Sequence, residues 1–204
     1  MDRGSTLLFG ILLTFASSWL GLVWLPYVQL NDQPPQADDL TGSLYPRPPA
    51  GEVAEGRRVY QANGCVYCHS QQVRGREFGT DIERGWGRRR SVPRDFIRDR
   101  PHLLGTMRTG PDLMNVADRL PSPDWHHKHL YNPRMMVPGS IMPAFPFLYE
   151  ERAVVGQPSE DALEFPPEWA PAEGYEIVPT PEAKALVAYL LSLGNRPDLP
   201  EAKE

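Results

Sequence analysis

The amino-acid sequence predicts a mainly α-helical chain, with one membrane-spanning helix near the N-terminus and a second helical domain that carries long, proline-rich loops. Three observations lead to this prediction. The stretch from Gly4 to Leu30 contains no charged side chain. Later segments have the apolar spacing and the end signals of helices. Most of the 23 prolines lie outside these segments, where they do not interrupt a helix.

The stretch from Gly4 to Leu30 is long enough to cross a membrane as a helix. At about 1.5 Å per residue, a helix of this length exceeds the roughly 30 Å hydrocarbon core of a bilayer. Pro26 is expected to end or kink the helix, and aromatic rings that favour the membrane interface lie near this end: Trp19, Trp24 and Tyr27. A cleaved signal peptide is the alternative, but the apolar run continues past the small residues at 16–18.

A tether and a larger domain are expected after the anchor at residues 1–30. Residues 31–51 are polar and rich in proline, as in a semi-rigid spacer. Residues 52–204 form the domain, in which the acidic stretch 143–179 is expected to be a long irregular loop. The end signals predict three helices: Glu52 to Asn63 before Gly64, Asp124 to Tyr131 before Asn132-Pro133, and one from Thr180-Pro181 to Gly194.

The composition argues against a nucleic-acid-binding protein, because the net charge is −5 and no overall basic surface is indicated. Both cysteines of the chain lie in one short motif. No disulfide is therefore expected to stabilise the fold.

Residues 65–69 read Cys-Val-Tyr-Cys-His, the signature for covalent attachment of a c-type haem. Positions i and i+3 share one face of a helical turn, so Cys65 and Cys68 can form thioethers with the two vinyl groups of one porphyrin. His69 then follows as the proximal ligand of the iron. A structural zinc site usually takes four protein ligands, and no βαβ pattern supports a thioredoxin-like redox pair.

The second axial ligand is expected to be Met142, in the extended turn Gly-Ser-Ile-Met-Pro at residues 139–143. A thioether raises the reduction potential relative to two histidines, which suits an electron carrier at the oxidising end of a chain. Met135 and Met136 are the alternatives, and the other methionines are expected to fill the core. The group His126, His127 and His129 is not expected to bind a metal, because no known motif spacing accompanies it.

The segment Arg108-Thr109-Gly110-Pro111-Asp112-Leu113 resembles the loop of class I cytochromes c. The resemblance implies a haem domain of that class, in which the Pro111 carbonyl accepts the second N–H of His69. It also implies a close crossing of the first and last helices of the domain, with generic helix packing as the alternative; the residues are Gly56, Tyr60, Leu186 and Tyr189.

Arg108 and Arg134 are predicted partners for the haem propionates, because a guanidinium group matches a carboxylate. The alternative is that each is a solvated surface arginine.

Longer blocks are similar to the mono-haem subunit of cbb3-type cytochrome c oxidases (subunit II, CcoO or FixO). Order, spacing, N-terminal anchor and total length agree, and the blocks are residues 64–74, 108–113, 124–126, 129–134, 137–138 and 142–143. The resemblance implies one covalent haem c and single-electron transfer, without catalysis by this chain, to the catalytic haem–copper subunit. Other cytochrome c subunits are further implied partners. The chain departs from the family at residues 75–78, 84–100 and 149–179, which are expected to face partner subunits.

Haem attachment at this motif takes place outside the cytoplasm, on the far side of the bacterial inner membrane. The charges agree, since Arg3 and the terminal amine lie on one side of the helix and Asp32, Asp38 and Asp39 on the other. We therefore expect a single-pass protein with a cytoplasmic N-terminus and a periplasmic haem domain.

Two other functions stay open. One is an electron-transfer role in a related haem–copper reductase, such as nitric oxide reductase, or as a freestanding tethered shuttle. The other is a haem-based gas sensor or peroxidase, which requires an open sixth position on the iron. The acidic residues from Glu150 to Glu176 are expected to attract a basic soluble cytochrome c donor, with a solvated acidic loop as the alternative. The arginine-rich stretch would then face partner subunits or membrane lipid.

Overall fold

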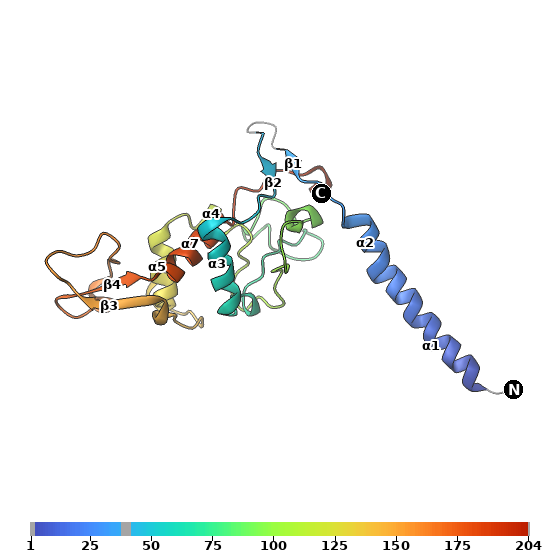
Figure 1. The fold of residues 1–204 in the computed structure, drawn as a ribbon, viewed down its shortest axis with the longest axis horizontal. Coiled ribbons are helices and arrows are strands. Elements are labelled where there is room, and N and C mark those ends of the chain that lie inside the picture. Colours follow the sequence, from blue (N-terminus) through green and yellow to red (C-terminus); the bar gives the residue numbers. More distant parts are fainter. Residues whose placement is uncertain (1–2, 38–41, 204) are drawn as a thin grey trace. The chain divides into compact units, whose positions relative to one another are not determined.

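The computed structural model describes residues 3–37 and 42–203 and is mainly helical (Figure 1). The predicted fold class, with one apolar N-terminal helix and few strands, is confirmed. The chain divides into two compact units, residues 1–47 with 92–98 and residues 48–91 with 99–204. Asp38 and Asp39, which supported the predicted orientation, lie outside the described residues.

The N-terminal helix runs without a break from Arg3 to Leu30, a length of 28 residues that is apolar enough to cross a membrane. It consists of α1 (Arg3–Trp19), a π-helical turn (Leu20–Trp24) and α2 (Leu25–Leu30). Of the two outcomes expected at Pro26, an end or a kink, the end is wrong, because the helix continues to Leu30. The wider π turn ends at Trp24, two residues before Pro26, and such turns accommodate a residue that lacks an N–H and crowds the preceding turn.

The segment predicted as a tether contains a small antiparallel sheet of β1 (Gln36–Ala37) and β2 (Leu44–Tyr45). The Tyr45 hydroxyl donates a 2.5 Å hydrogen bond to the buried Asp95 carboxylate, which also accepts the Val92 N–H at 2.8 Å. Residues 92–98 therefore pack with the N-terminal unit, although the residues before and after them in the sequence belong to the second unit.

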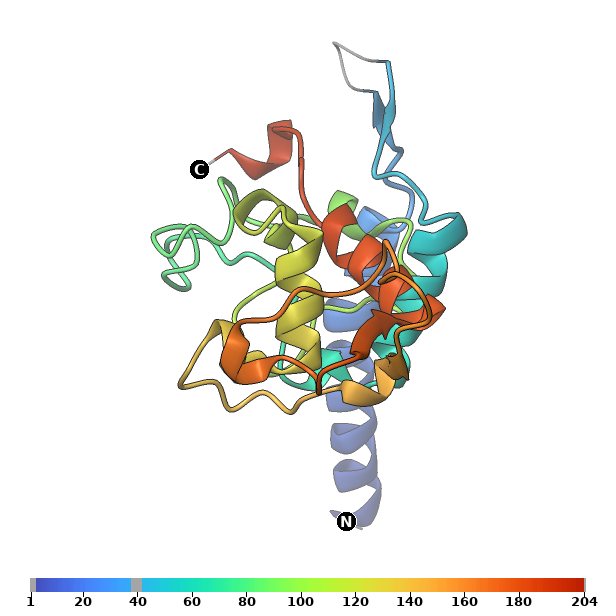
Figure 2. The same cartoon turned by 90° about the vertical axis from the view of Figure 1, so that its left-hand side faces the viewer.

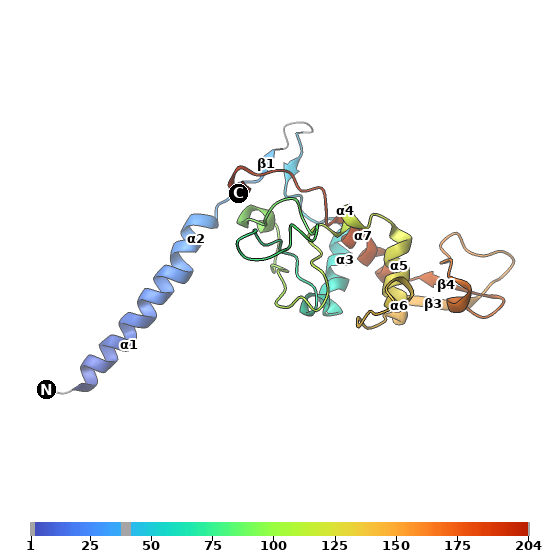
Figure 3. The same ribbon diagram turned by 180° about the vertical axis from the view of Figure 1, so that it is seen from behind.

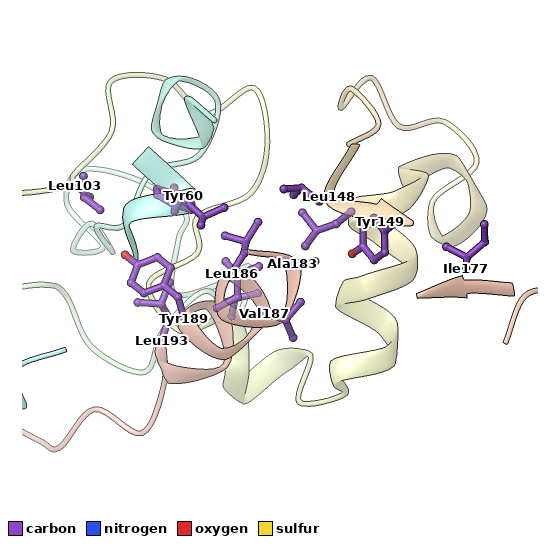
Figure 4. Close-up of a cluster of buried hydrophobic side chains, with 14 residues drawn as sticks. Tyr60, Leu103, Leu148, Tyr149, Ile177, Ala183, Leu186, Val187, Tyr189 and Leu193 are labelled. Carbon is purple, nitrogen blue, oxygen red and sulfur yellow. The ribbon is translucent and has the colours of Figure 1, made fainter. Parts of the chain in front are cut away.

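The second unit is built on the crossing of α3 (Gly51–Ala62) and α7 (Pro181–Ser192). Figure 4 shows buried side chains from both helices, among them Tyr60 of α3 and Leu186 and Tyr189 of α7. A Cβ atom at Gly56 would overlap the Ala185 carbonyl and lie 2.8 Å from the Tyr189 Cβ, so the helices touch where α3 has no side chain. The rings of Tyr60 and Tyr189 lie 5.4 Å apart beside this contact. The predicted helices and their close crossing are confirmed.

Three short helices follow in the chain: α4 (Val116–Arg119), α5 (Pro123–Tyr131) and α6 (Pro133–Met136). α4 and α5 pack against α7, and α6 packs against α5. Figure 2 shows α5, in yellow, lying beside α7, in orange-red. The Ser122 side chain accepts the Trp125 N–H, and the Asn132 side chain accepts the Arg134 N–H. These caps explain why one helix ends where the next begins.

The stretch 143–179 is not wholly irregular, so that prediction is wrong near both of its ends. β3 (Tyr149–Ala153) pairs antiparallel with β4 (Tyr175–Pro179), with Tyr149 opposite Pro179 (Figure 3). Tyr149 and Ile177 are buried in the core cluster. The acidic segment therefore connects two short paired strands, each of which packs one residue into the core.

Candidate haem site

The motif at 65–69 begins where α3 ends. Gly64 adopts a positive φ of 68°, a conformation that glycine adopts without strain, and the 3₁₀ turn Cys65–Tyr67 follows. The His69 N–H donates to the Cys65 carbonyl at 3.0 Å, which closes the turn. Cys65 is partly buried against the core cluster, whereas Cys68 is exposed.

The loop 108–113 lies along the residues that follow the motif. The Gly110 N–H donates to the Cys68 carbonyl at 2.9 Å, and the Leu113 N–H donates to the Ser70 carbonyl at 2.8 Å. Between these two contacts, His69 Nδ1 lies 2.8 Å from the Pro111 carbonyl oxygen. A carbonyl only accepts, so this contact assigns the proton to Nδ1 and leaves Nε2 as the nitrogen with a free lone pair. The hydrogen bond implied by the resemblance is therefore present.

Gly110 is required for this arrangement. A Cβ atom there would overlap Cε1 of the His69 ring and lie 2.7 Å from Nδ1 and 2.9 Å from Nε2. The backbone at Gly110 therefore packs against the edge of the imidazole formed by Nδ1, Cε1 and Nε2, and no residue larger than glycine fits there.

Burial decides the protonation states of the motif. It raises the pKa of the Cys65 thiol to about 11. It also lowers the pKa of His69, although the Pro111 carbonyl and the Asp112 carboxylate partly oppose this. At neutral pH His69 is therefore neutral, and the neutral imidazole is the form that ligates iron.

Asp112 anchors the loop through a fully buried carboxylate, with 0% of the residue exposed. One oxygen accepts the Ser70 hydroxyl at 2.7 Å and the Gln72 N–H at 2.8 Å, and the other accepts the Met114 N–H at 2.8 Å. In the sequence, Asp112 is notable only as part of the motif at residues 108–113. The available signal is an acidic residue directly after Pro111.

Arg108 is held by the protein itself. Its Nε donates to the Ser70 hydroxyl at 2.9 Å, its Nη2 donates to the Gln72 carbonyl at 2.5 Å, and its Nη1 pairs with the buried Asp81. Each guanidinium nitrogen of Arg108 thus has a partner, and a propionate contact stays a prediction. Arg134, the other predicted propionate partner, is exposed at the start of α6.

Met142 is partly buried and packs against the same core cluster as Cys65 and Leu113. Its backbone N–H donates to the Ser140 hydroxyl at 3.3 Å, which stabilises the turn. The alternatives Met135 and Met136 are also partly buried, on α6. Met114 is 1% exposed and fills the core, as expected, whereas Met107 is 60% exposed.

The three histidines of α5 make separate contacts. His126 Nε2 lies 2.9 Å from the Leu120 carbonyl, and His127 Nδ1 lies 3.2 Å from the Tyr149 hydroxyl. The His129 ring stacks on Trp125, with centroids 4.6 Å apart. Burial lowers the pKa of both His127 and His129 to about 4, so these rings are neutral at pH 7.

The polar groups around the motif fit a haem. Across residues 3–37 and 42–203, three buried side-chain atoms lack a hydrogen-bond partner: Tyr60 Oη, Arg119 Nε and His129 Nδ1. Arg119 Nη2 donates to the carbonyl of Asp112, the residue after Pro111. Unsatisfied buried groups of this kind are expected where a ligand with polar groups completes the site.

A family model described as cytochrome c oxidase, mono-haem subunit/FixO matches residues 43–164. The matched range includes the motif at 65–69, the loop at 108–113 and Met142. No curated protein matches the chain.

Proposed function

The chain belongs to the FixO family of mono-haem cytochrome c oxidase subunits, and on this premise we propose that it relays single electrons to the catalytic subunit of a haem–copper terminal oxidase. The observation that carries the proposal is the match to this family over a range that contains the Cys-Val-Tyr-Cys-His motif. The chain itself needs no general acid or base, because oxygen reduction belongs to the catalytic subunit.

We assign the haem-binding roles to Cys65, Cys68 and His69 of the motif and to Met142. Cys65 and Cys68 would form the thioethers, and His69 and Met142 would ligate the iron. The bound haem supplies a one-electron couple between ferric and ferrous iron. The chain contributes a neutral imidazole whose tautomer is fixed by the hydrogen bond from His69 Nδ1 to the Pro111 carbonyl. This hydrogen bond makes the imidazole more electron-rich as a ligand.

Arg119 is an additional partner for the haem propionates, beside the predicted Arg108 and Arg134. Its Nη2 donates to the Asp112 carbonyl, whereas its buried Nε has no partner. Burial lowers the pKa of this guanidinium, so a nearby anion would stabilise its charge. A propionate of the bound haem would supply such an anion.

The helix from Arg3 to Leu30 supports a membrane anchor. We propose that the anchor lies in the bacterial inner membrane, with a cytoplasmic N-terminus and a periplasmic haem domain. The partners that follow are membrane lipid, the catalytic haem–copper subunit and other cytochrome c subunits. The exposed acidic residues between Glu150 and Glu173 are suited to attract a basic soluble electron donor, an effect that salt weakens.

Purification in a mild detergent tests this function. A tagged chain taken from its native membranes is expected to carry along a larger subunit that contains b-type haem and copper. A tagged membrane protein without the haem motif serves as control. Isolation of the chain alone, without b-type haem or copper, contradicts the oxidase role and favours a freestanding shuttle. Recovery of b-type haem without copper would instead indicate a related reductase.

A further inference from the structure

We propose that Asp81 and Arg108 are positioning residues for the haem ligand His69: their buried ion pair fastens the segment after the motif to the loop that carries Pro111. The proposal rests on the role of His69 as haem ligand in the proposed function. It gives a role to the arginine-rich excursion between Arg74 and Arg108, which includes two of the stretches that depart from the family.

Asp81 is the buried acid of this excursion that pairs with Arg108. The residue is 1% exposed, and its carboxylate accepts the Arg74 backbone N–H at 2.8 Å and the Arg74 Nη2 at 3.2 Å. Arg108 Nη1 completes the set. Burial raises the pKa of the Asp81 carboxyl, but the hydrogen bonds from Arg108 and Arg74 outweigh it and hold the pKa below its usual range. The carboxylate is therefore charged at neutral pH.

A continuous set of contacts leads from Asp81 to the haem ligand. Arg108 bonds to the Ser70 hydroxyl and the Gln72 carbonyl, and the Ser70 hydroxyl donates to Asp112 at 2.7 Å. Asp112 directly follows Pro111, whose carbonyl accepts from His69. Arg108 Nη2 also lies 3.7 Å from the Asp112 carboxylate. Without Asp81, the Arg108 fork would lose the nearer of these two carboxylates, and the Ser70–Asp112 contact would lose part of its support.

Trp86 covers this network. Its ring centroid lies 5.3 Å from the Arg108 guanidinium carbon and 5.1 Å from that of Arg84. The backbone N–H of Trp86 donates to the Asp81 carbonyl at 2.9 Å. The backbone carbonyl of Trp86 accepts a hydrogen bond from Asn115 Nδ2 at 2.8 Å. The Arg108 side chain is consequently only 18% exposed. A low-dielectric environment of this kind strengthens each charged contact in the set.

The expected effect on His69 has a definite direction. Loss of Asp81 weakens the hydrogen bond between His69 Nδ1 and the Pro111 carbonyl. The imidazole then donates less electron density to ferric iron. It also removes a buried negative charge from the haem domain. Both changes destabilise the ferric form relative to the ferrous form, so the reduction potential is expected to rise.

The test uses the full chain with haem attached and compares three variants. Asp81→Asn removes the charge, Arg108→Lys keeps a charge but loses the planar fork, and Glu83→Gln is the matched control. Glu83 belongs to the same excursion and pairs with Arg76, but both side chains are about half exposed. The readouts are the reduction potential and the rate at which the His69 Nδ1 proton exchanges with deuterated water.

We expect Asp81→Asn and Arg108→Lys to raise the potential and to accelerate the His69 proton exchange by roughly tenfold, while Glu83→Gln changes neither. Exchange rates and potentials equal to those of Glu83→Gln in both variants would overturn the proposal. Neither readout needs an oxidase partner. A chain that purifies alone would therefore contradict the proposed function and leave this test intact.

Discussion

Replacing Gly110 with alanine is expected to displace His69 from the position of haem ligand. The added Cβ would overlap Cε1 of the ring and lie 2.7 Å from Nδ1. Relief of such overpacking is worth about 1–3 kcal/mol, which exceeds the roughly 1 kcal/mol net contribution of the single hydrogen bond to Pro111. The ring is therefore expected to move rather than the loop. The measurement is the absorption spectrum of the ferric and ferrous protein.

The expected spectrum of Gly110→Ala lacks the signature of a low-spin, six-coordinate iron. Gly139→Ala is the matched control, because a Cβ at Gly139 meets nothing within 4 Å. It makes the same chemical change in the same unit, close to Met142 in sequence, and is expected to keep the wild-type spectrum. A Gly110→Ala protein with wild-type spectrum and reduction potential would show that the flat contact between loop and ring is not needed.

Gly56→Ala is expected to destabilise the whole second unit. Its Cβ would overlap the carbonyl of Ala185, a backbone group that cannot rotate away. The helices α3 and α7 must then move apart at the centre of the core, which costs about 3 kcal/mol of a total stability of roughly 5–15 kcal/mol. This outcome opposes the intrinsic helix preference, which favours alanine over glycine by about 1 kcal/mol.

Urea unfolding of the haem-loaded protein measures the effect of Gly56→Ala. The control is Ala54→Val, which enlarges an exposed side chain two positions earlier in α3 and is expected to change the free energy of unfolding by about 0.5 kcal/mol or less. A Gly56→Ala protein as stable as the wild type would mean that the two helices do not meet as closely as described.

The helices and the motif could be predicted because their signals are local. Thr180 and Pro181 mark the start of α7 within two residues, and the Thr180 side chain accepts the Ala183 N–H as expected. The haem motif likewise depends on spacing within one turn. Local signals of this kind need no knowledge of distant parts of the chain.

Asp81 could not be predicted, because its burial depends on Arg108, which lies 27 positions later. On sequence alone it is one of several acids in an arginine-rich stretch. The same holds for part of that stretch itself, which was expected to face partners or lipid. Arg89 Nε donates to the Pro197 carbonyl at 2.8 Å and Arg90 Nη2 to the Glu201 carbonyl at 2.6 Å, so two of these arginines bind the C-terminal segment.

The strands β3 and β4 were missed for a related reason. Each has five residues, and only their pairing across the intervening acidic segment gives them regular structure. Met142 could be predicted only in part. The turn at residues 139–143 marks it as a candidate ligand in the sequence, but its packing against the core cluster that also contacts Cys65 depends on the folded chain.

The account depends most directly on a single haem bound through Cys65 and Cys68, with its iron between His69 and Met142. Intact mass together with the absorption spectrum of the purified full chain measures both parts at once. The account predicts a mass increase of one haem that persists in denaturant, and a thioether-to-iron charge-transfer band that disappears in Met142→Ala. A mature chain without added haem mass, or a spectrum typical of two nitrogen ligands, would contradict it.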